Sequence, residues 1–386
     1  MEKALIILNN NSSIYSSWIK NKVSNKYDPI IYYLEENLKY TKKEIINHIN
    51  NLIKYEKIEA TFFQGDYISL IDYDFITKIN SHKKFIYLTD DFDNHEVNSL
   101  NALACNAIMN CCPLSSLKYE EKQLKSFFFV HESDESIFKK INLKKEIDVL
   151  FFGAMKANRE ELINKLKENN INFKIVGPAN GNFLTYEELN KEINKSKIVI
   201  NFTQTGNKNK FYSHESYPFS YLQVKGRVFI SGFCGTLCIS EDAPGYKLIF
   251  SEDTLPTFCN PNEMIEKINF FLKNSSALKD YTEKFTQECN KFRDGIYTKK
   301  VFEQLLQVNH KKVLKSLPIW YLRAFNLKNM RLYSKEKSIK KFLVNSLYNI
   351  LIYSKYSNYK FLFIIIETLI YTPFFSLKII LNKIKI

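Results

Sequence analysis

Short runs of apolar residues alternate with longer amphipathic stretches along the first third of the chain, and this alternation limits the folds that the chain can adopt. Between two of these runs, residues 41–58 repeat isoleucine and leucine at helical spacing. Strands that alternate with helices form βαβ units with right-handed crossovers, so we expect a doubly wound parallel sheet. Its predicted strands are residues 4–8, 29–34, 60–64, 85–88, 107–110 and 127–130.

A second block with the same alternation follows a charged stretch at residues 139–148. We therefore predict an α/β protein with two Rossmann-like domains, residues 1–145 and 146–305, facing each other across a cleft. A mainly helical extension, residues 306–386, completes the chain. In the second block the predicted strands are residues 149–153, 173–176, 198–202 and 236–240, and the predicted helices are residues 159–168, 186–195, 227–234, 261–273 and 274–303.

The net charge of +14 lies almost entirely in the extension, which holds 15 lysine or arginine residues and two acidic residues, Glu336 and Glu367. Its aromatic residues alternate with these cations, and an apolar region follows at residues 361–377. Because Glu367 and Pro373 interrupt that region, it falls short of the roughly 18–20 clean apolar residues that a spanning helix needs. We expect the extension to lie in the interface of an anionic membrane. A helical hairpin that packs against the domains, or an oligomer contact, is the alternative.

The seven cysteine residues are scattered and form no CxxC pair, so we expect neither a zinc site nor another metal site. The apolar run at residues 4–8 is too short for a signal peptide. We therefore expect a cytoplasmic protein with reduced thiols, associated peripherally with the inner face of the membrane.

The loop after the first strand of the second block, Gly153 to Arg159, combines a glycine with two cations, Lys156 and Arg159. Glycine permits close approach to a ligand, and a helix N-terminus attracts anions, so the loop could cradle a diphosphate. It lacks the GxGxxG and P-loop patterns, and a solvated helix start would look the same.

A second basic pair, Lys225 and Arg227, stands at the predicted start of another helix, where the helix dipole and the side chains would act together on an anion. Glu241 and Asp242 follow the next strand, and their carboxylates could accept hydrogen bonds from sugar or ribose hydroxyls. An ordinary loop with surface charges is the competing interpretation.

These segments together resemble the C-terminal domain of GT-B glycosyltransferases, specifically the spore-maturation-type branch and the retaining glycosyltransferase family 4. The matching segments are residues 148–153 with Arg159, residues 198–202, residues 225–229 and residues 235–242, with residues 256–258 and 263–272 as the closing strand and helix. The resemblance covers about 40% of the chain, and the N-terminal domain matches only in architecture, as at residues 87–91. One position departs from it, because Ile230 stands where relatives carry a glutamate that holds donor hydroxyls. Either another carboxylate, Glu241 or Glu215, takes that role, or donor binding is altered, or the chain is an inactive member.

Two further regions supply candidate residues under this resemblance. The polar loop at residues 203–220 holds His214 and Glu215, which suit sugar or nucleobase recognition, although a loop histidine is commonly just exposed. In the first domain the loops after the strands would receive the acceptor, with Asp90, Asp91 and His131 as candidate catalytic residues. Aspartates at strand ends are also routine helix caps.

The resemblance implies a glycosyltransferase of hexosyltransferase type that moves a sugar from a nucleotide-diphosphate donor to a glycan or lipid-linked acceptor. The basic residues would stabilise the leaving diphosphate, so we expect no metal and no cofactor, and retention of configuration. A non-catalytic scaffold with the same fold is one alternative. An RNA-binding protein acting through the basic extension is another, although we expect no nucleic-acid partner.

Overall fold

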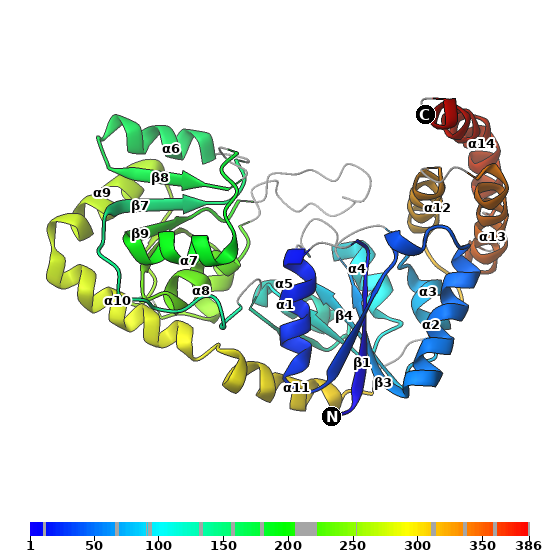
Figure 1. The fold of residues 1–386 in the computed structure, drawn as a ribbon, viewed down its shortest axis with the longest axis horizontal. Coiled ribbons are helices and arrows are strands. Elements are labelled where there is room, and N and C mark those ends of the chain that lie inside the picture. The colour runs from blue at the N-terminus through cyan, green and yellow to red at the C-terminus, as the bar shows by residue number, and fades with distance from the viewer. Residues whose placement is uncertain are drawn as a thin grey trace.

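The first sheet consists of six parallel strands in the order β2-β1-β3-β4-β5-β6, as the alternating pattern predicts (Figure 1). The computed structural model describes residues 1–10, 13–65, 69–89, 91, 95–130, 134–155, 159–177, 181–204, 222–251, 253–309, 314–334, 338–357 and 361–384. Elements of the first domain are β1 (Lys3–Leu8), α1 (Ser13–Ser24), β2 (Asp28–Tyr33), η1 (Glu35–Asn37), α2 (Lys42–Glu56), β3 (Ile58–Gln64), α3 (Tyr73–Lys78), β4 (Lys83–Leu88), α4 (His95–Ala102), β5 (Ala107–Asn110), α5 (Pro113–Glu121) and β6 (Ser126–Phe128).

The second sheet has five parallel strands in the order β11-β10-β9-β7-β8. In both sheets the order of the strands therefore reverses beside the first strand of the sheet. This switch point lies between β1 and β3 in the first sheet and between β7 and β9 in the second, as in a doubly wound topology. Elements of the second domain are β7 (Ile147–Phe152), α6 (Arg159–Glu168), β8 (Phe173–Val176), α7 (Tyr186–Lys195), β9 (Ser196–Asn201), α8 (Gly226–Phe233), β10 (Leu237–Glu241), η3 (Pro244–Leu248), β11 (Thr257–Phe258), α9 (Pro261–Lys273) and α10 (Ser275–Asn290).

After the second domain the chain returns to the first one through a π-helical turn, η4 (Asp294–Thr298), and α11 (Lys299–Leu306). Phe302 of α11 is buried among residues of the first sheet, with its ring 6.0 Å from that of Phe62. The crossing is fastened by a salt bridge between the buried Lys22 and Asp294. Helix α11, most of which falls in the predicted second domain (residues 146–305), therefore packs with the first domain.

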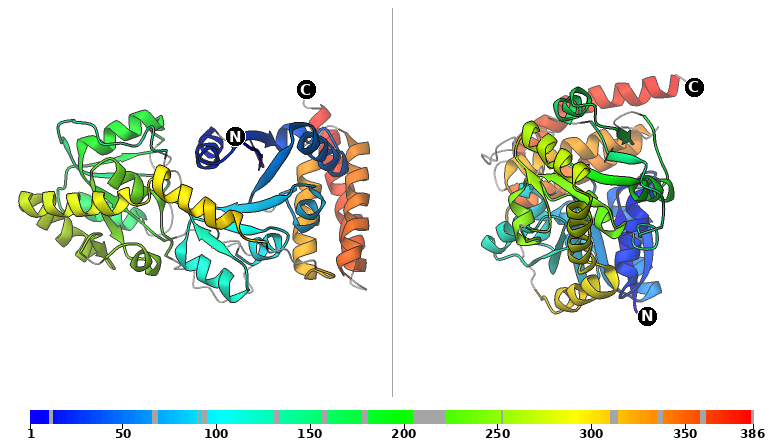
Figure 2. Two further views of the ribbon diagram at one scale, coloured as in Figure 1. Left: turned by 90° about the horizontal axis from the view of Figure 1, so that it is seen from below. Right: turned by 90° about the vertical axis from the view of Figure 1, so that its left-hand side faces the viewer.

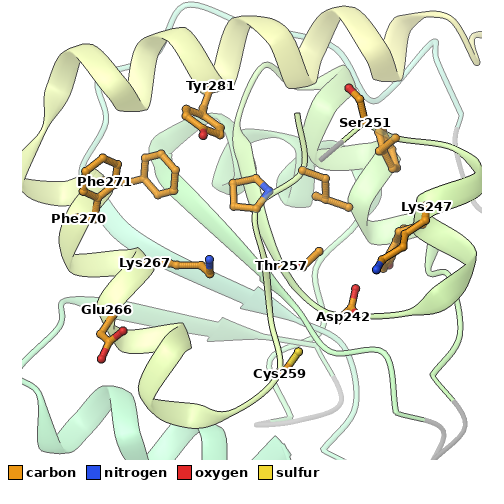
Figure 3. Close-up of a pocket in the computed structure, with 14 residues that line it drawn as sticks. Asp242, Lys247, Ser251, Thr257, Cys259, Glu266, Lys267, Phe270, Phe271 and Tyr281 are labelled. Atoms are coloured by element: carbon orange, nitrogen blue, oxygen red, sulfur yellow. The ribbon is translucent and has the colours of Figure 1, made fainter. Parts of the chain in front are cut away.

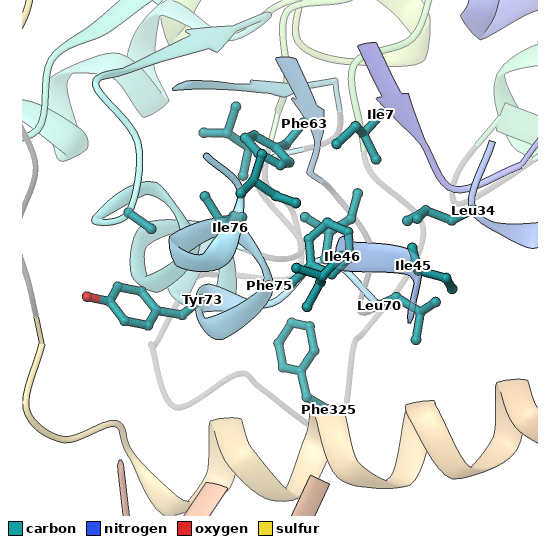
Figure 4. Packing of buried hydrophobic residues seen from close by; sticks show 14 of the residues in the cluster. Ile7, Leu34, Ile45, Ile46, Phe63, Leu70, Tyr73, Phe75, Ile76 and Phe325 are labelled. Carbon is teal, nitrogen blue, oxygen red and sulfur yellow. The ribbon is translucent and has the colours of Figure 1, made fainter. Parts of the chain in front are cut away.

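Three helices form the extension: α12 (Ile319–Tyr333), α13 (Ile339–Ser357) and α14 (Phe361–Ile384). They stand together at the end of the first domain that faces away from the second domain (Figures 1 and 2). Phe325 of α12 points into the core that Ile45, Leu70 and Phe75 build (Figure 4).

Buried polar contacts fasten the extension to α2 and α3. The carboxylate of Asp72 accepts hydrogen bonds from Lys42 Nζ at 2.5 Å and from the Tyr353 hydroxyl at 2.8 Å. The Tyr321 hydroxyl accepts from the backbone N–H of Tyr73 at 2.8 Å. All these side chains are buried, so the inner face of the extension completes the core of the first domain.

Candidate functional site

Arg227, near the start of α8, contacts both strands between which the strand order of the second sheet reverses, β7 and β9. Its Nε donates to the Phe152 carbonyl at the end of β7 at 2.7 Å, and its Nη1 donates to Asn201 Oδ1 at the end of β9 at 2.6 Å. The guanidinium also lies 5.1 Å from the ring centroids of both Phe151 and Phe152. Ligands of doubly wound sheets bind outside the carboxyl ends of the strands at this reversal, so Arg227 occupies the expected binding position.

Gly153, directly after β7, leaves the space that Arg227 fills. Its φ of +135° is a conformation that residues with a side chain rarely adopt, and a Cβ built on it would lie 2.5 Å from Arg227 Nη2. The glycine therefore allows the guanidinium to reach the strand end.

Arg159, the first residue of α6, lies at the same strand end. Its Nη1 donates to the Ala154 carbonyl at 2.6 Å, and its guanidinium lies 6.0 Å from the Phe151 ring centroid. The guanidinium groups of Arg159 and Arg227 therefore both lie near the Phe151 ring, close to the end of β7. Arg159 is 6% exposed, and its described contact holds the loop backbone.

A hydrogen-bond network connects the second basic loop to the sheet. The hydroxyl of Tyr246, in η3, accepts from Asn201 Nδ2 at 2.9 Å and from the backbone N–H of Lys225 at 3.2 Å. Complete burial raises the pKa of this hydroxyl, which therefore stays protonated. The network fixes the N-terminus of α8, and sequence reasoning did not identify Tyr246 or Asn201 as site residues. Asn201 had a signal in the sequence, because it is the polar residue that directly follows the apolar run at residues 198–200.

Glu241, at the end of β10, has a structural role that the sequence did not suggest. Its Oε2 accepts from the backbone N–H of Thr203 at 2.8 Å, from the Thr203 hydroxyl at 3.1 Å and from the backbone N–H of Gln204 at 3.1 Å. The carboxylate is 8% exposed and anchors the chain that leaves β9. Asp242 is half-buried and lines a separate cavity.

Ile230 is 4% exposed and belongs to the hydrophobic core of the second domain. The position at which the resembled family is expected to carry a glutamate is therefore a packing position here. Helix α8 itself, Gly226–Phe233, contains no carboxylate. Of the two carboxylates that could take the role, Glu241 accepts hydrogen bonds from Thr203 and Gln204, and Glu215 lies outside the described residues.

In the first domain, Asp91 is fully buried and accepts hydrogen bonds from His95 Nδ1 at 2.9 Å, Asn98 Nδ2 at 2.9 Å and the Tyr119 hydroxyl at 2.5 Å. Burial by itself would raise the pKa of Asp91, but the hydrogen bond and charge of His95, together with Tyr119 and Asn98, outweigh it and hold the pKa below its usual value. Asp91 therefore orients His95, a residue that sequence reasoning missed. His95 Nε2 is buried without a hydrogen-bond partner in the described structure.

The reversal point of the first sheet is also polar. The backbone N–H of Asn9, after β1, donates to Gln64 Oε1 at the end of β3 at 2.9 Å, and the side-chain amide of Asn9 has no partner among the described residues. Gln223, two residues before Lys225, donates through Nε2 to the Thr89 carbonyl after β4 at 3.1 Å. The loop before α8 therefore touches the carboxyl end of a strand in the other domain.

Five of the predicted site residues, Asp90, His131, Lys156, His214 and Glu215, lie outside the described residues. In the part of the chain that is described, no group of three or more His, Cys, Asp or Glu side chains could hold a metal ion.

A cavity of about 640 Å³ lies away from the arginines, at the edge strand β11 and between α9, α10 and η3 (Figure 3). Phe270, Phe271 and Tyr281 lie on one side of it, and Asp242 and Lys247 on the other. Among the predicted donor-binding residues that the structure describes, only Asp242 lines this cavity.

Residues 159–306 match the family model described as glycosyl transferase-like. The match begins at Arg159. It includes Arg227 in α8, and Glu241 and Asp242 at the end of β10. No curated protein sequence matches the chain.

Solved structures resemble the whole two-domain body. The HepE protein of Anabaena, in complex with UDP and glucose, is 7% identical with a TM-score of 0.56, covering 80% of this chain and 100% of its own. Sucrose-phosphate synthase of Thermosynechococcus elongatus is 8% identical with a TM-score of 0.54, covering 80% and 98%. The chain has the GT-B fold. A putative UDP-N-acetylglucosamine 2-epimerase of Listeria monocytogenes is also similar, at 11% identity and a TM-score of 0.51, covering 81% of this chain and 99% of its own. The fold alone therefore does not distinguish a glycosyltransferase from an epimerase.

Proposed function

We propose that this GT-B protein is a glycosyltransferase that moves a sugar from a nucleotide-diphosphate donor to a glycan or lipid-linked acceptor. The observation that carries the proposal is the pair of guanidinium groups, Arg159 and Arg227, at the end of β7, where the second sheet reverses. The glycosyl transferase-like match over residues 159–306 and the neighbour bound to UDP and glucose support it.

In this proposal the diphosphate of the donor lies against the N-terminus of α8. Backbone N–H groups at a helix start and nearby cations stabilise the negative charge that develops on the leaving nucleoside diphosphate. Lys225 and Lys156 add their charge to that of Arg227. This work needs neither a metal nor a cofactor, and we propose retaining transfer of a hexosyl group, as in the spore-maturation-type and family 4 enzymes that the sequence resembles.

On the acceptor side, we propose that Asp91 acts through His95 rather than directly. Three donors already occupy the Asp91 carboxylate, whereas His95 Nε2 is buried and unpartnered in the described structure. Asp91 is thus a positioning residue for an imidazole, and Asn9 and Gln64 border the same edge of the sheet.

The test is a binding series with the full-length chain, in which isothermal titration measures UDP, GDP, ADP and CMP and their sugar conjugates. We expect one nucleotide family to bind and its sugar conjugate to be hydrolysed slowly in the absence of acceptor. Lys225→Ala should weaken diphosphate binding by about ten-fold or more, since one charge-assisted contact is lost. Lys165→Ala, which removes an exposed lysine from α6, is the matched control and should bind as the unmodified chain does.

Ile230 gives a second candidate, a GT-B protein that binds nucleotide sugars without transferring them. Binding without turnover over a broad acceptor panel would favour it. If no nucleotide binds, both candidates are wrong.

A further inference from the structure

The helices α13 and α14 have an inverted distribution of polar and apolar residues. Asn345, Ser346 and Asn349 of α13 are buried, whereas Leu347 and Leu351 are 61% and 66% exposed. A helix that packs on a protein in water normally buries its apolar side and exposes its polar side. Polar residues between helices and apolar residues facing outward are typical of helices that contact lipid.

Helix α14 continues the same arrangement. Its inner side is joined to α12 by polar contacts: Arg323 Nε and Nη2 donate to Glu367 Oε1 at 3.0 and 2.9 Å, and Asn326 Nδ2 donates to Thr368 Oγ1 at 2.9 Å. Arg323 thereby neutralises Glu367, one of the residues that interrupt the apolar region of the sequence.

The outward side chains of α13 and α14 form what we call the apolar face. Its members are all large hydrophobic residues that are exposed: Leu343, Val344, Leu347, Leu351, Leu362, Phe363, Ile366, Leu369, Ile370, Tyr371, Phe374, Leu377 and Ile380. Because α13 packs along α14, the face extends over both helices. Together these side chains expose on the order of 1,000 Å², more than the largest apolar patch of an ordinary monomer.

Basic residues border the apolar face. A groove of about 770 Å³ between α2 and α13 is lined by Lys43, Lys78 and Lys355 next to the exposed Leu351. The ammonium group of Lys78 is held by Asp74 at 2.8 Å, which leaves Lys43 and Lys355 as the cations that can meet an outside anion. The 15 basic and two acidic residues of the extension give the surrounding surface the same sign.

We propose that the apolar face docks on an anionic lipid bilayer, with Lys43 and Lys355 against the phosphate headgroups at its border. The charge of the extension favours a bilayer over a second copy of the chain. Two strongly cationic extensions would repel each other, whereas an anionic leaflet attracts each lysine. A nucleic acid would match the charge but has nothing to cover the leucine and phenylalanine side chains. The inference is independent of sugar transfer, because none of its residues belongs to the site described above.

The face lies on the bilayer rather than crossing it. By length and composition, residues Leu362–Ile380 are the one described segment that could span a membrane, with a mean hydropathy of 1.7. However, its inner side is bound through Glu367 and Thr368 to α12, and α12 is part of the core of the first domain. The helix therefore has one side for protein and one for lipid.

Co-sedimentation of the full-length chain with vesicles tests the proposal. The chain should bind vesicles of phosphatidylcholine mixed with phosphatidylglycerol, and bind them more weakly at high salt. The triple variant Leu347→Gln/Leu351→Gln/Leu369→Gln should lose at least about ten-fold in affinity, since apolar area no longer enters the bilayer. These side chains are mostly exposed, so the fold should persist, which circular dichroism checks.

Two control variants distinguish binding through the apolar face from non-specific hydrophobic binding to vesicles. Phe183→Gln/Ile296→Gln removes two exposed apolar side chains outside the extension and should bind like the unmodified chain. Lys43→Gln/Lys355→Gln should weaken binding to the mixed vesicles about five-fold per lysine. Unchanged binding of the triple variant would overturn the proposal. So would a dimer that the triple variant dissociates, or tight RNA binding with no vesicle binding.

Discussion

Replacement of Gly153 by alanine probes the link between the two basic loops of the second domain. The added Cβ would lie 2.5 Å from Arg227 Nη2, which is closer than such atoms approach in proteins, so the guanidinium would have to move. It cannot move freely, because Nε and Nη1 are bonded to the Phe152 carbonyl and to Asn201 Oδ1. At least one of these hydrogen bonds should break.

The magnitude follows from two contributions. A hydrogen bond to a charged group is worth about 1.5–3 kcal/mol, and a residue other than glycine at φ +135° costs about 1–3 kcal/mol more. Gly153→Ala should therefore destabilise the second domain by roughly 3–6 kcal/mol. Gly181→Ala is the matched control, because Gly181 has φ +72° with no heavy atom within 4 Å of its built Cβ, and it should cost only about 1–2 kcal/mol.

Native-state hydrogen exchange on peptides from β7 and β9 measures these free energies. Tryptophan fluorescence would not, because the two tryptophans, Trp18 and Trp320, both pack with the first domain. In an Arg227→Ala background the collision disappears, so Gly153→Ala should cost less there by about 1.5–3 kcal/mol. Additive effects, within about 0.5 kcal/mol, would refute the described contact.

Two further predictions concern titratable groups. Lys145 is exposed as a residue, but its ammonium group packs against the Ser196 carbonyl and the Thr236 hydroxyl, and the resulting desolvation lowers its pKa to about 8. The folded chain therefore releases this proton before the unfolded chain does, and stability should rise between about pH 8 and 10.5. Urea unfolding followed by circular dichroism should show this slope reduced in Lys145→Met, and an unchanged slope would contradict the assignment. Six of the seven cysteines are buried and Cys259 is exposed, and burial raises the pKa of Cys234 and Cys238 to about 12. A thiol reagent should therefore modify one group in the native chain and none in Cys259→Ser, whereas several fast-reacting thiols would contradict the burial.

The central strands could be predicted because they are short apolar runs that a parallel sheet buries on both faces, as in residues 149–152. The same pattern predicted that Gly153 follows a strand and that Arg227 lies at the start of a helix. The hydrogen-bond partners of the site residues could not be predicted from the sequence. Asp91 meets His95 one helical turn later, and Glu241 meets Thr203 across neighbouring strands, and only the folded backbone defines such pairs.

The composition of the extension did not predict how its helices are oriented. Its aromatic residues suggested membrane contact, yet Tyr321 and Tyr353 are buried against the first domain, while leucines of α13 and α14 point outward. Composition is the same for both orientations of an amphipathic helix. The choice depends on partners such as Asp72, which lies more than 240 residues earlier in the sequence.

The return of the chain through η4 and α11 makes the second domain an insertion within the first. Asp134 and Asp294, which mark its two ends, are held by neighbouring residues of α1, Asn21 and Lys22. During synthesis the inserted half can finish folding while the half that emerged first still lacks α11 and α12. Premature termination between α10 and α11 would therefore leave the first domain incomplete, although the second domain, which is synthesised later, already has all its strands and helices.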